Sequence, residues 1–291
     1  MYIPFSHVRK AISSSTSDNT VVWGVFRLDP DQNMAGIICQ WFLQAIVLLL
    51  TQRLLYGNLK DERRLKSYVI GVNVMCLMHT LFRTILAFDY IHGTAGEFIT
   101  VPEFALPVMI TIETMVIQTF FLFRCWTIMA KRAWAIAPLV VVWISSGVAG
   151  VFFAVATDYC PKLVTTTLAT WVALSCSLDL TMTVITMIYL IQRQREYKAY
   201  SRVLMTIWNM LWLAAVPPML AMIGLIITMY ILHSGSWATF IYDILSKLFV
   251  LSLLIAITGR ERAASKLKET TQMELCLAAL GSGSTLGRSS G

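Results

Sequence analysis

The stretch Tyr242–Arg262 reads YDILSKLFVLSLLIAITGRER and decides the fold class of this chain. It holds an apolar run of the length that crosses a bilayer, which takes about 20 residues in a helix. Asp243 and Lys247 lie inside it, four residues apart, and so share one helical face. Because ionisable side chains in a bilayer nearly always face the protein interior or a watery cavity, this helix needs other helices around it.

The composition places the whole chain in the membrane class. Of its 291 residues, 57% are hydrophobic and 13% are charged, whereas soluble domains carry about a quarter charged residues. The net charge of +7 comes from short basic clusters between apolar runs, a pattern typical of membrane orientation. Basic stripes with interleaved aromatic residues are absent from the sequence, so we expect no nucleic-acid partner.

Six further apolar runs precede this stretch, and each is long enough to cross a bilayer. They cover about residues 34–55, 67–88, 104–129, 135–156, 165–191 and 203–232. The sequence therefore predicts an all-α polytopic membrane protein, a bundle of seven transmembrane helices over residues 34–259. Residues 1–33 are expected to form an extracellular tail and residues 260–291 a cytoplasmic tail. The Gly/Ser-rich end of the second tail predicts partial disorder.

Basic residues alternate between successive loops. The loops after spans one, three and five and the C-terminal tail up to Lys268 hold 5, 2, 4 and 4 basic residues, whereas the loops after spans two, four and six hold 0, 1 and 0. Since cytoplasmic loops carry the excess of Lys and Arg, the N-terminus is predicted outside and the C-terminus in the cytosol. We expect the plasma membrane as the location.

Ionisable residues occur inside four of the spans, at similar depths when the helical rise is counted along each span. Two interpretations remain open. The residues form a ligand pocket open to the outer side, or they form internal ion pairs, Arg83 with Glu113 and Lys247 with Asp179 or Asp243. The six candidate site residues are His79, Arg83, Glu113, Asp179, Asp243 and Lys247.

Other features bear on mechanism. Pro217 and Pro218 remove two backbone donors from the sixth span and predict a kink, either a hinge or a static bend. The fourth span carries Ser146, Gly150 and Ala154 at four-residue spacing, a stripe that lets another helix approach closely. His79 is the one histidine well inside a span, so we expect no metal site and no cofactor.

The run SKLFVLSLLIAITGRE resembles the closing signature of fungal, chiefly basidiomycete, seven-helix membrane proteins with a C-terminal domain of unknown function. Their pattern is similar to S-K-L-Y-x-N-S-L-L-A-x-L-N-x-R. The chain departs from it at Leu251 and at Thr258-Gly259. Seven residues stand at matching places: Ser246, Lys247, Leu248, Ser252, Leu253, Leu254 and Arg260. Three further stretches agree in order: LLYG at Leu54–Gly57, FFLFRCWTI at Phe120–Ile128 and SLDLTMTVITMIYLIQRQR at Ser177–Arg195.

A second resemblance concerns Asp243 and Lys247, whose spacing is similar to that in the retinal-attachment helix of microbial rhodopsins. There the lysine carries the Schiff base and the aspartate is a counterion. The third span, however, offers Glu113 and no Arg-Tyr-x-Asp-Trp-like stretch. The fungal resemblance explains the same lysine without retinal.

We therefore expect a receptor-like protein that senses a small molecule and contacts a cytoplasmic signalling partner. The alternative is a membrane enzyme or carrier acting on a lipid or terpenoid, with Glu113 and Asp179 as acid and base. A retinal-binding protein is a further alternative. Whether the chain has any catalytic residues stays open, because no phosphate-binding loop or nucleophile elbow occurs in the sequence.

Overall fold

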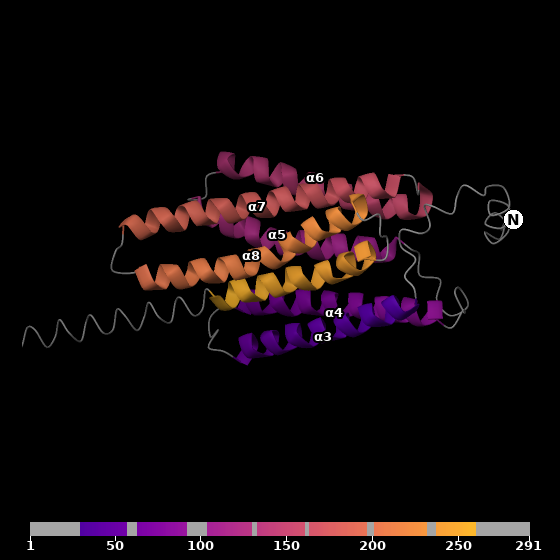
Figure 1. The fold of residues 1–291 in the computed structure, drawn as a ribbon. Coiled ribbons are helices and arrows are strands. Elements are labelled where there is room, and N and C mark those ends of the chain that lie inside the picture. The colour runs from indigo at the N-terminus through magenta and orange to yellow at the C-terminus, as the bar shows by residue number, and fades with distance from the viewer. Residues whose placement is uncertain are drawn as a thin grey trace, which may run out of the picture.

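The structure, a computed structural model, describes residues 30–56, 63–91, 104–129, 133–160, 163–196, 201–231 and 237–259. The predicted tails, apart from residues 30–33, lie outside these ranges. A seventh helix, Trp237–Gly259, closes the bundle and is called the C-terminal helix below. The six helices before it are α3 (Pro30–Tyr56), α4 (Arg63–Ile91), α5 (Ala105–Ile128), α6 (Ala133–Tyr159), α7 (Val164–Glu196) and α8 (Ser201–Tyr230) (Figure 1).

All seven helices are long and apolar enough to cross a membrane, with mean hydropathies from 1.6 to 2.3. Large apolar side chains cover the outer faces of the helices, such as Phe42 on α3, Phe152 on α6 and Leu213 on α8. So much exposed apolar surface is unfavourable in water and suits contact with lipid chains. The predicted all-α, seven-helix membrane bundle is confirmed. Its orientation in the membrane stays a prediction.

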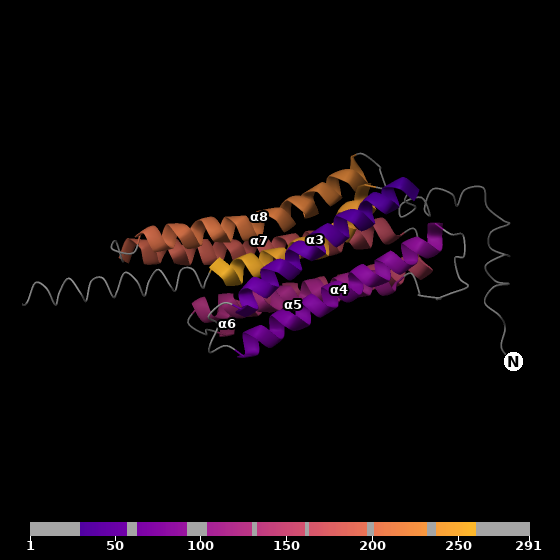
Figure 2. The same cartoon turned by 90° about the horizontal axis from the view of Figure 1, so that it is seen from below.

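The C-terminal helix is the central helix of the bundle. About two thirds of its span (67%) is buried, against 28–44% in the other six spans. Helices that follow one another in the chain pack together from α3 to α8, and α5 also packs against α7. In Figures 1 and 2 the C-terminal helix, drawn in yellow, runs between α8 on one side and α3 and α4 on the other. The residues on nearly every face of this helix therefore contact protein rather than lipid.

Several helix boundaries differ from the predicted spans. The C-terminal helix begins at Trp237, the last residue of the turn predicted at His233–Trp237, so the predicted start of this span agrees with the structure. Helix α7 continues to Glu196, beyond the predicted end of its span at residue 191. Helix α8 begins at Ser201, before the predicted start of its span at residue 203. Backbone hydrogen bonding can continue a helix beyond the end of the apolar run.

Pro217 and Pro218 lie inside α8, which remains helical on both sides of them. Figures 1 and 2 both show α8 changing direction about halfway along its length. A bend is the expected result of two missing backbone donors and of the clash of each ring with the preceding turn. The bend agrees with the predicted kink and leaves open whether it acts as a hinge.

The small-residue stripe of α6 faces α5 and α7, as its spacing predicts. A Cβ atom on Gly150 would lie 2.5 Å from Cγ2 of Thr111, which is too close, and 3.0 Å from Cδ1 of Trp171, which is unusually tight. The hydroxyl oxygens of Ser146 on α6 and Ser175 on α7 are 2.8 Å apart, within hydrogen-bond distance. Close approach here fixes the three helices relative to one another.

Candidate functional site

The middle of the C-terminal helix carries the most deeply buried charge of the described chain. Lys247 is fully buried (0% exposed), as is its neighbour Ser246. Four other buried residues from α3, α4 and α5 surround this pair. We call the six residues the polar core: Gln44, Cys76, His79, Glu113, Ser246 and Lys247.

The ammonium group of Lys247 makes three hydrogen bonds, and none of them is to a carboxylate. Nζ donates to the carbonyl oxygen of Cys76 at 2.6 Å, to Sγ of Cys76 at 2.9 Å and to Oε1 of Gln44 at 3.1 Å. Within the described residues, no ion pair joins it to Asp179 or Asp243. The predicted pairing of Lys247 is therefore wrong, because its amine points toward α3 and α4 instead.

Gln44 links the lysine to a wider set of uncharged polar groups. Its Oε1 also accepts from the hydroxyl of Thr80 at 3.4 Å and from the thiol of Cys76 at 3.3 Å. Its Nε2 donates to Oδ1 of Asn73 at 3.5 Å, and Asn73 in turn donates to Thr51. The network joins α3 to α4. Hydrogen bonds of this kind between helices replace those that water supplies outside a membrane.

His79 of α4 and Glu113 of α5 lie near Ser246, the neighbour of Lys247 on the C-terminal helix. Nδ1 of His79 is 3.2 Å from the hydroxyl of Ser246 and 4.0 Å from Oε2 of Glu113. The second distance is too long for a hydrogen bond. Both carboxyl oxygens of Glu113 and Nε2 of His79 are buried. None of these three atoms has a hydrogen-bond partner among the described residues. The acid and the imidazole are therefore close and incompletely satisfied.

Tyr242 adds a further buried group without a partner. Its ring packs edge-on against Phe153 of α6 and Trp171 of α7, with ring centroids 5.6 Å and 5.9 Å away. The hydroxyl is buried and has no hydrogen-bond partner within the described chain. An unsatisfied polar group in a bilayer costs several kcal/mol (roughly 2–7 on transfer scales). The other buried side-chain atoms without a partner in the described chain lie mostly on α5 and α3, with one each on α4 and α7.

Arg83 and Asp243 form an ion pair. Nε of Arg83 donates to Oδ2 of Asp243 at 2.7 Å, and the two side chains are 16% and 9% exposed. The sequence-based pairing of Arg83 with Glu113 is therefore wrong. Arg83 lies one helical turn beyond His79 on α4, and Asp243 one turn before Lys247 on the C-terminal helix. The two turns meet at the same level, whereas Glu113 faces His79.

Asp179 lies apart from the other five predicted residues. Its Oδ1 is 3.4 Å from Nε2 of Gln118, which donates to it, and its Oδ2 is buried without a partner. None of the hydrogen bonds or ion pairs in the described ranges links it to the polar core. Gln118 is more than a turn along α5 from Glu113, so Glu113 and Asp179 do not make a facing acid–base pair through these contacts.

Three members of the polar core were not among the candidate site residues: Gln44, Cys76 and Ser246. Each is uncharged, and uncharged polar residues are frequent in transmembrane helices. A usable signal exists in α3, where Gln40 and Gln44 stand four apart in an apolar run, and both are buried. Two adjacent amides on one face of a span indicate a polar partner on another helix.

No family model matches the chain, and neither a curated protein nor a solved structure does. The arrangement of these side chains is consequently the basis for assigning a function.

Proposed function

We propose that this integral membrane protein is receptor-like and binds a small polar molecule at the polar core. The observation that carries the proposal is the Glu113 carboxyl, which is 2% exposed and has no hydrogen-bond partner at either oxygen in the described chain. Burial of such a group in a bilayer is costly unless it is satisfied. A ligand that donates to Glu113, and takes the place of Gln44 as one of the three acceptors of Lys247, would relieve that cost and would therefore favour the bound state.

The contrast with the Arg83–Asp243 pair supports this assignment. Those two charges satisfy each other at 2.7 Å and need no ligand. They suit a role in fixing the register of α4 against the C-terminal helix. Glu113, His79 and Lys247 form no ion pair at hydrogen-bond distance among the described residues, so internal pairing alone does not explain why they are present.

Native mass spectrometry of the purified protein tests the binding proposal. We expect wild-type protein to retain a small polar molecule, and Glu113→Leu to lose it, because leucine keeps much of the side-chain volume and removes the acceptor. Thr119→Val on the exposed face of α5 is the matched control and should retain the same mass. A wild-type protein that carries only bilayer lipids, with the same spectrum in Glu113→Leu, would contradict the proposal.

Orientation forms part of the same proposal: the N-terminal side faces outside and the C-terminal side faces the cytosol of the plasma membrane. Basic residues cluster at the ends where α3 and α7 finish, as the positive-inside rule requires. The receptor would then meet its signalling partner at the α3–α4, α5–α6 and α7–α8 connections. We further propose kinship with the fungal seven-helix family, on Ser246, Lys247 and the residues that follow them.

Thiol labelling in intact cells tests the orientation. Cys160, at the end of α6, is exposed, whereas Cys76 and Cys125 are buried in the bundle. With Cys276 replaced by serine, a membrane-impermeant maleimide should label Cys160 from outside, and Cys160→Ser should lose the label. Labelling that appears only after the cells are opened would reverse the orientation.

A further inference from the structure

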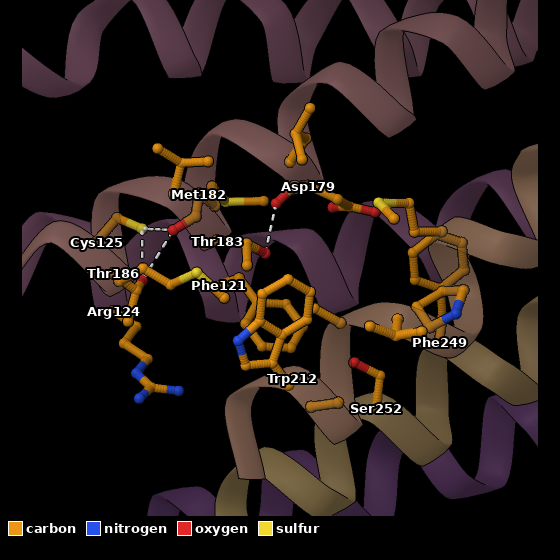
Figure 3. A pocket seen from close by; sticks show the side chains of 18 residues that line it. Phe121, Arg124, Cys125, Asp179, Met182, Thr183, Thr186, Trp212, Phe249 and Ser252 are labelled. Carbon is orange, nitrogen blue, oxygen red and sulfur yellow. Dashed lines mark hydrogen bonds between the residues drawn. The ribbon is translucent and has the colours of Figure 1, made fainter. Parts of the chain in front are cut away.

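A second site lies away from the polar core, between α5, α7, α8 and the C-terminal helix. A cavity of about 160 Å³ occupies this place. Apolar side chains form most of its wall, among them Phe121, Met182, Trp212 and Phe249 (Figure 3). An apolar cavity of about 150 Å³ in a protein can stay dry and bind a ring the size of benzene. The site is thus large enough for a six-membered carbocycle.

Asp179 is the carboxylate in this lining, and it supplies an acceptor. Gln118 donates to its Oδ1, whereas Oδ2 is buried and has no partner among the described residues. The terminal torsion of an aspartate is soft, so Oδ2 can reorient toward a donor bound in this lining. The hydroxyls of Thr183 and Thr186 donate to carbonyls of their own helix and compete little for a ligand.

The wall also carries one guanidinium, that of Arg124. Figure 3 shows its nitrogen atoms pointing away from Asp179. A positive charge in the same lining disfavours a cationic ligand, and the Asp179 carboxylate disfavours an anionic one. The combination of an apolar wall with one open acceptor favours a neutral molecule that has a single hydroxyl donor.

The rim of the cavity reaches the lipid. Leu180 and Val184 line it, are 51% and 43% exposed, and belong to the face of α7 that bears the exposed Ile188. Trp212 of α8 is 43% exposed on the other side of the rim. A molecule dissolved in the hydrocarbon phase can therefore enter sideways between α7 and α8.

We infer that this cavity binds a membrane-soluble alicyclic alcohol, whose ring fills the apolar space and whose hydroxyl donates to Asp179. The site differs in location and in ligand chemistry from the polar core. Its test consequently succeeds or fails independently of ligand binding at Glu113 and Lys247.

Photolabelling in lipid nanodiscs tests the inference with two matched probes: a cyclohexanol that carries a spiro-diazirine, and the same diazirine-bearing ring without the hydroxyl. Labelling of Met182, Trp212 and Phe249 is measured against labelling of the lipid-facing Phe152, which corrects for partition into the bilayer. We expect the alcohol to label the cavity about tenfold more than the hydrocarbon ring, the effect of one hydrogen bond to a charged acceptor.

Two variants separate the hydroxyl contact from the cavity itself. Asp179→Leu should lower alcohol labelling to the level of the hydrocarbon ring. Ala215→Phe places a ring in the cavity and should remove labelling by both probes, with Asp179 unchanged. Equal labelling by the two probes in wild-type protein would overturn the inference. Alcohol labelling that persists in Asp179→Leu, or cavity labelling that persists in Ala215→Phe, would overturn it as well.

Discussion

Replacing Arg83 by leucine should lower the free energy of unfolding by about 3–5 kcal/mol, the usual cost of leaving one member of a buried ion pair alone. The structure gives the reason: Asp243 is 9% exposed and accepts from Nε of Arg83 at 2.7 Å. Without the guanidinium the carboxylate stays in the bundle with no cation at that distance. Thermal and denaturant unfolding in detergent measure the loss, provided that wild type and variant are compared at the same lipid content.

A double-mutant cycle identifies the partner of Arg83. Arg83→Leu combined with Asp243→Leu should lose less stability than Arg83→Leu alone, because the double variant leaves neither charge behind. Arg83→Leu combined with Glu113→Leu is the control, and its losses should add to within about 0.5 kcal/mol. The reverse result, coupling to Glu113 and additivity with Asp243, would restore the pairing predicted from the sequence.

Lys247→Met should abolish ligand binding and leave a bundle at least as stable as wild type. The ammonium is fully buried, and its three hydrogen bonds include no carboxylate. Its removal leaves neither oxygen acceptor bare, because the thiol of Cys76 donates to Oε1 of Gln44 and the hydroxyl of Thr80 donates to the carbonyl of Cys76. Methionine fills most of the space of the lysine chain, so the variant loses a buried charge without creating a large void.

Lys247→Ala separates the charge from the packing. It removes the same ammonium and also deletes the side-chain stem, and we expect it to lose about 2–5 kcal/mol through the cavity left behind. Unfolding midpoints of the two variants, measured together, show which part of the lysine stabilises the bundle. Equal losses in Lys247→Met and Lys247→Ala would assign the stability to the charge.

Lys247→Met also distinguishes a retinal-binding protein from the receptor-like protein proposed above. The amine of Lys247 donates to Gln44 and Cys76, and the cavity between α7 and α8 is lined without it. We therefore expect no colour when the protein is expressed with retinal. A visible absorption band that disappears in Lys247→Met would instead identify a Schiff base and overturn the ligand assignment.

The sequence predicted the bundle well for a physical reason. Crossing a bilayer needs an apolar run whose length is set by the bilayer thickness, so the spans can be counted in the sequence. Each charged residue within such a run must face the protein interior, so the inward-facing residues can be identified as well. The interior location of His79, Glu113 and Lys247 was correct on this ground. The central position of the C-terminal helix also agrees with the sequence, because Asp243 and Lys247 both require a surrounding bundle.

The contacts between these residues could not be predicted in the same way. Arg83 pairs with Asp243 rather than Glu113 because the rotation and offset of each helix decide which carboxylate it meets. Neither quantity is encoded in the spacing of charges along a single span. Gln44 and Cys76 were missed since they carry no charge, although they provide the acceptors of Lys247.

Ligand binding at the polar core is tested most directly by the stability of the double variant Lys247→Met/Glu113→Leu, compared with wild type after bound molecules have been removed from both. If the two residues serve a ligand, the double variant should fold and should match or exceed the unfolding free energy of wild type, because both charges are replaced by apolar groups of similar size. A loss of about 3–5 kcal/mol would mean instead that the polar core holds the helices together, and would contradict the proposed function.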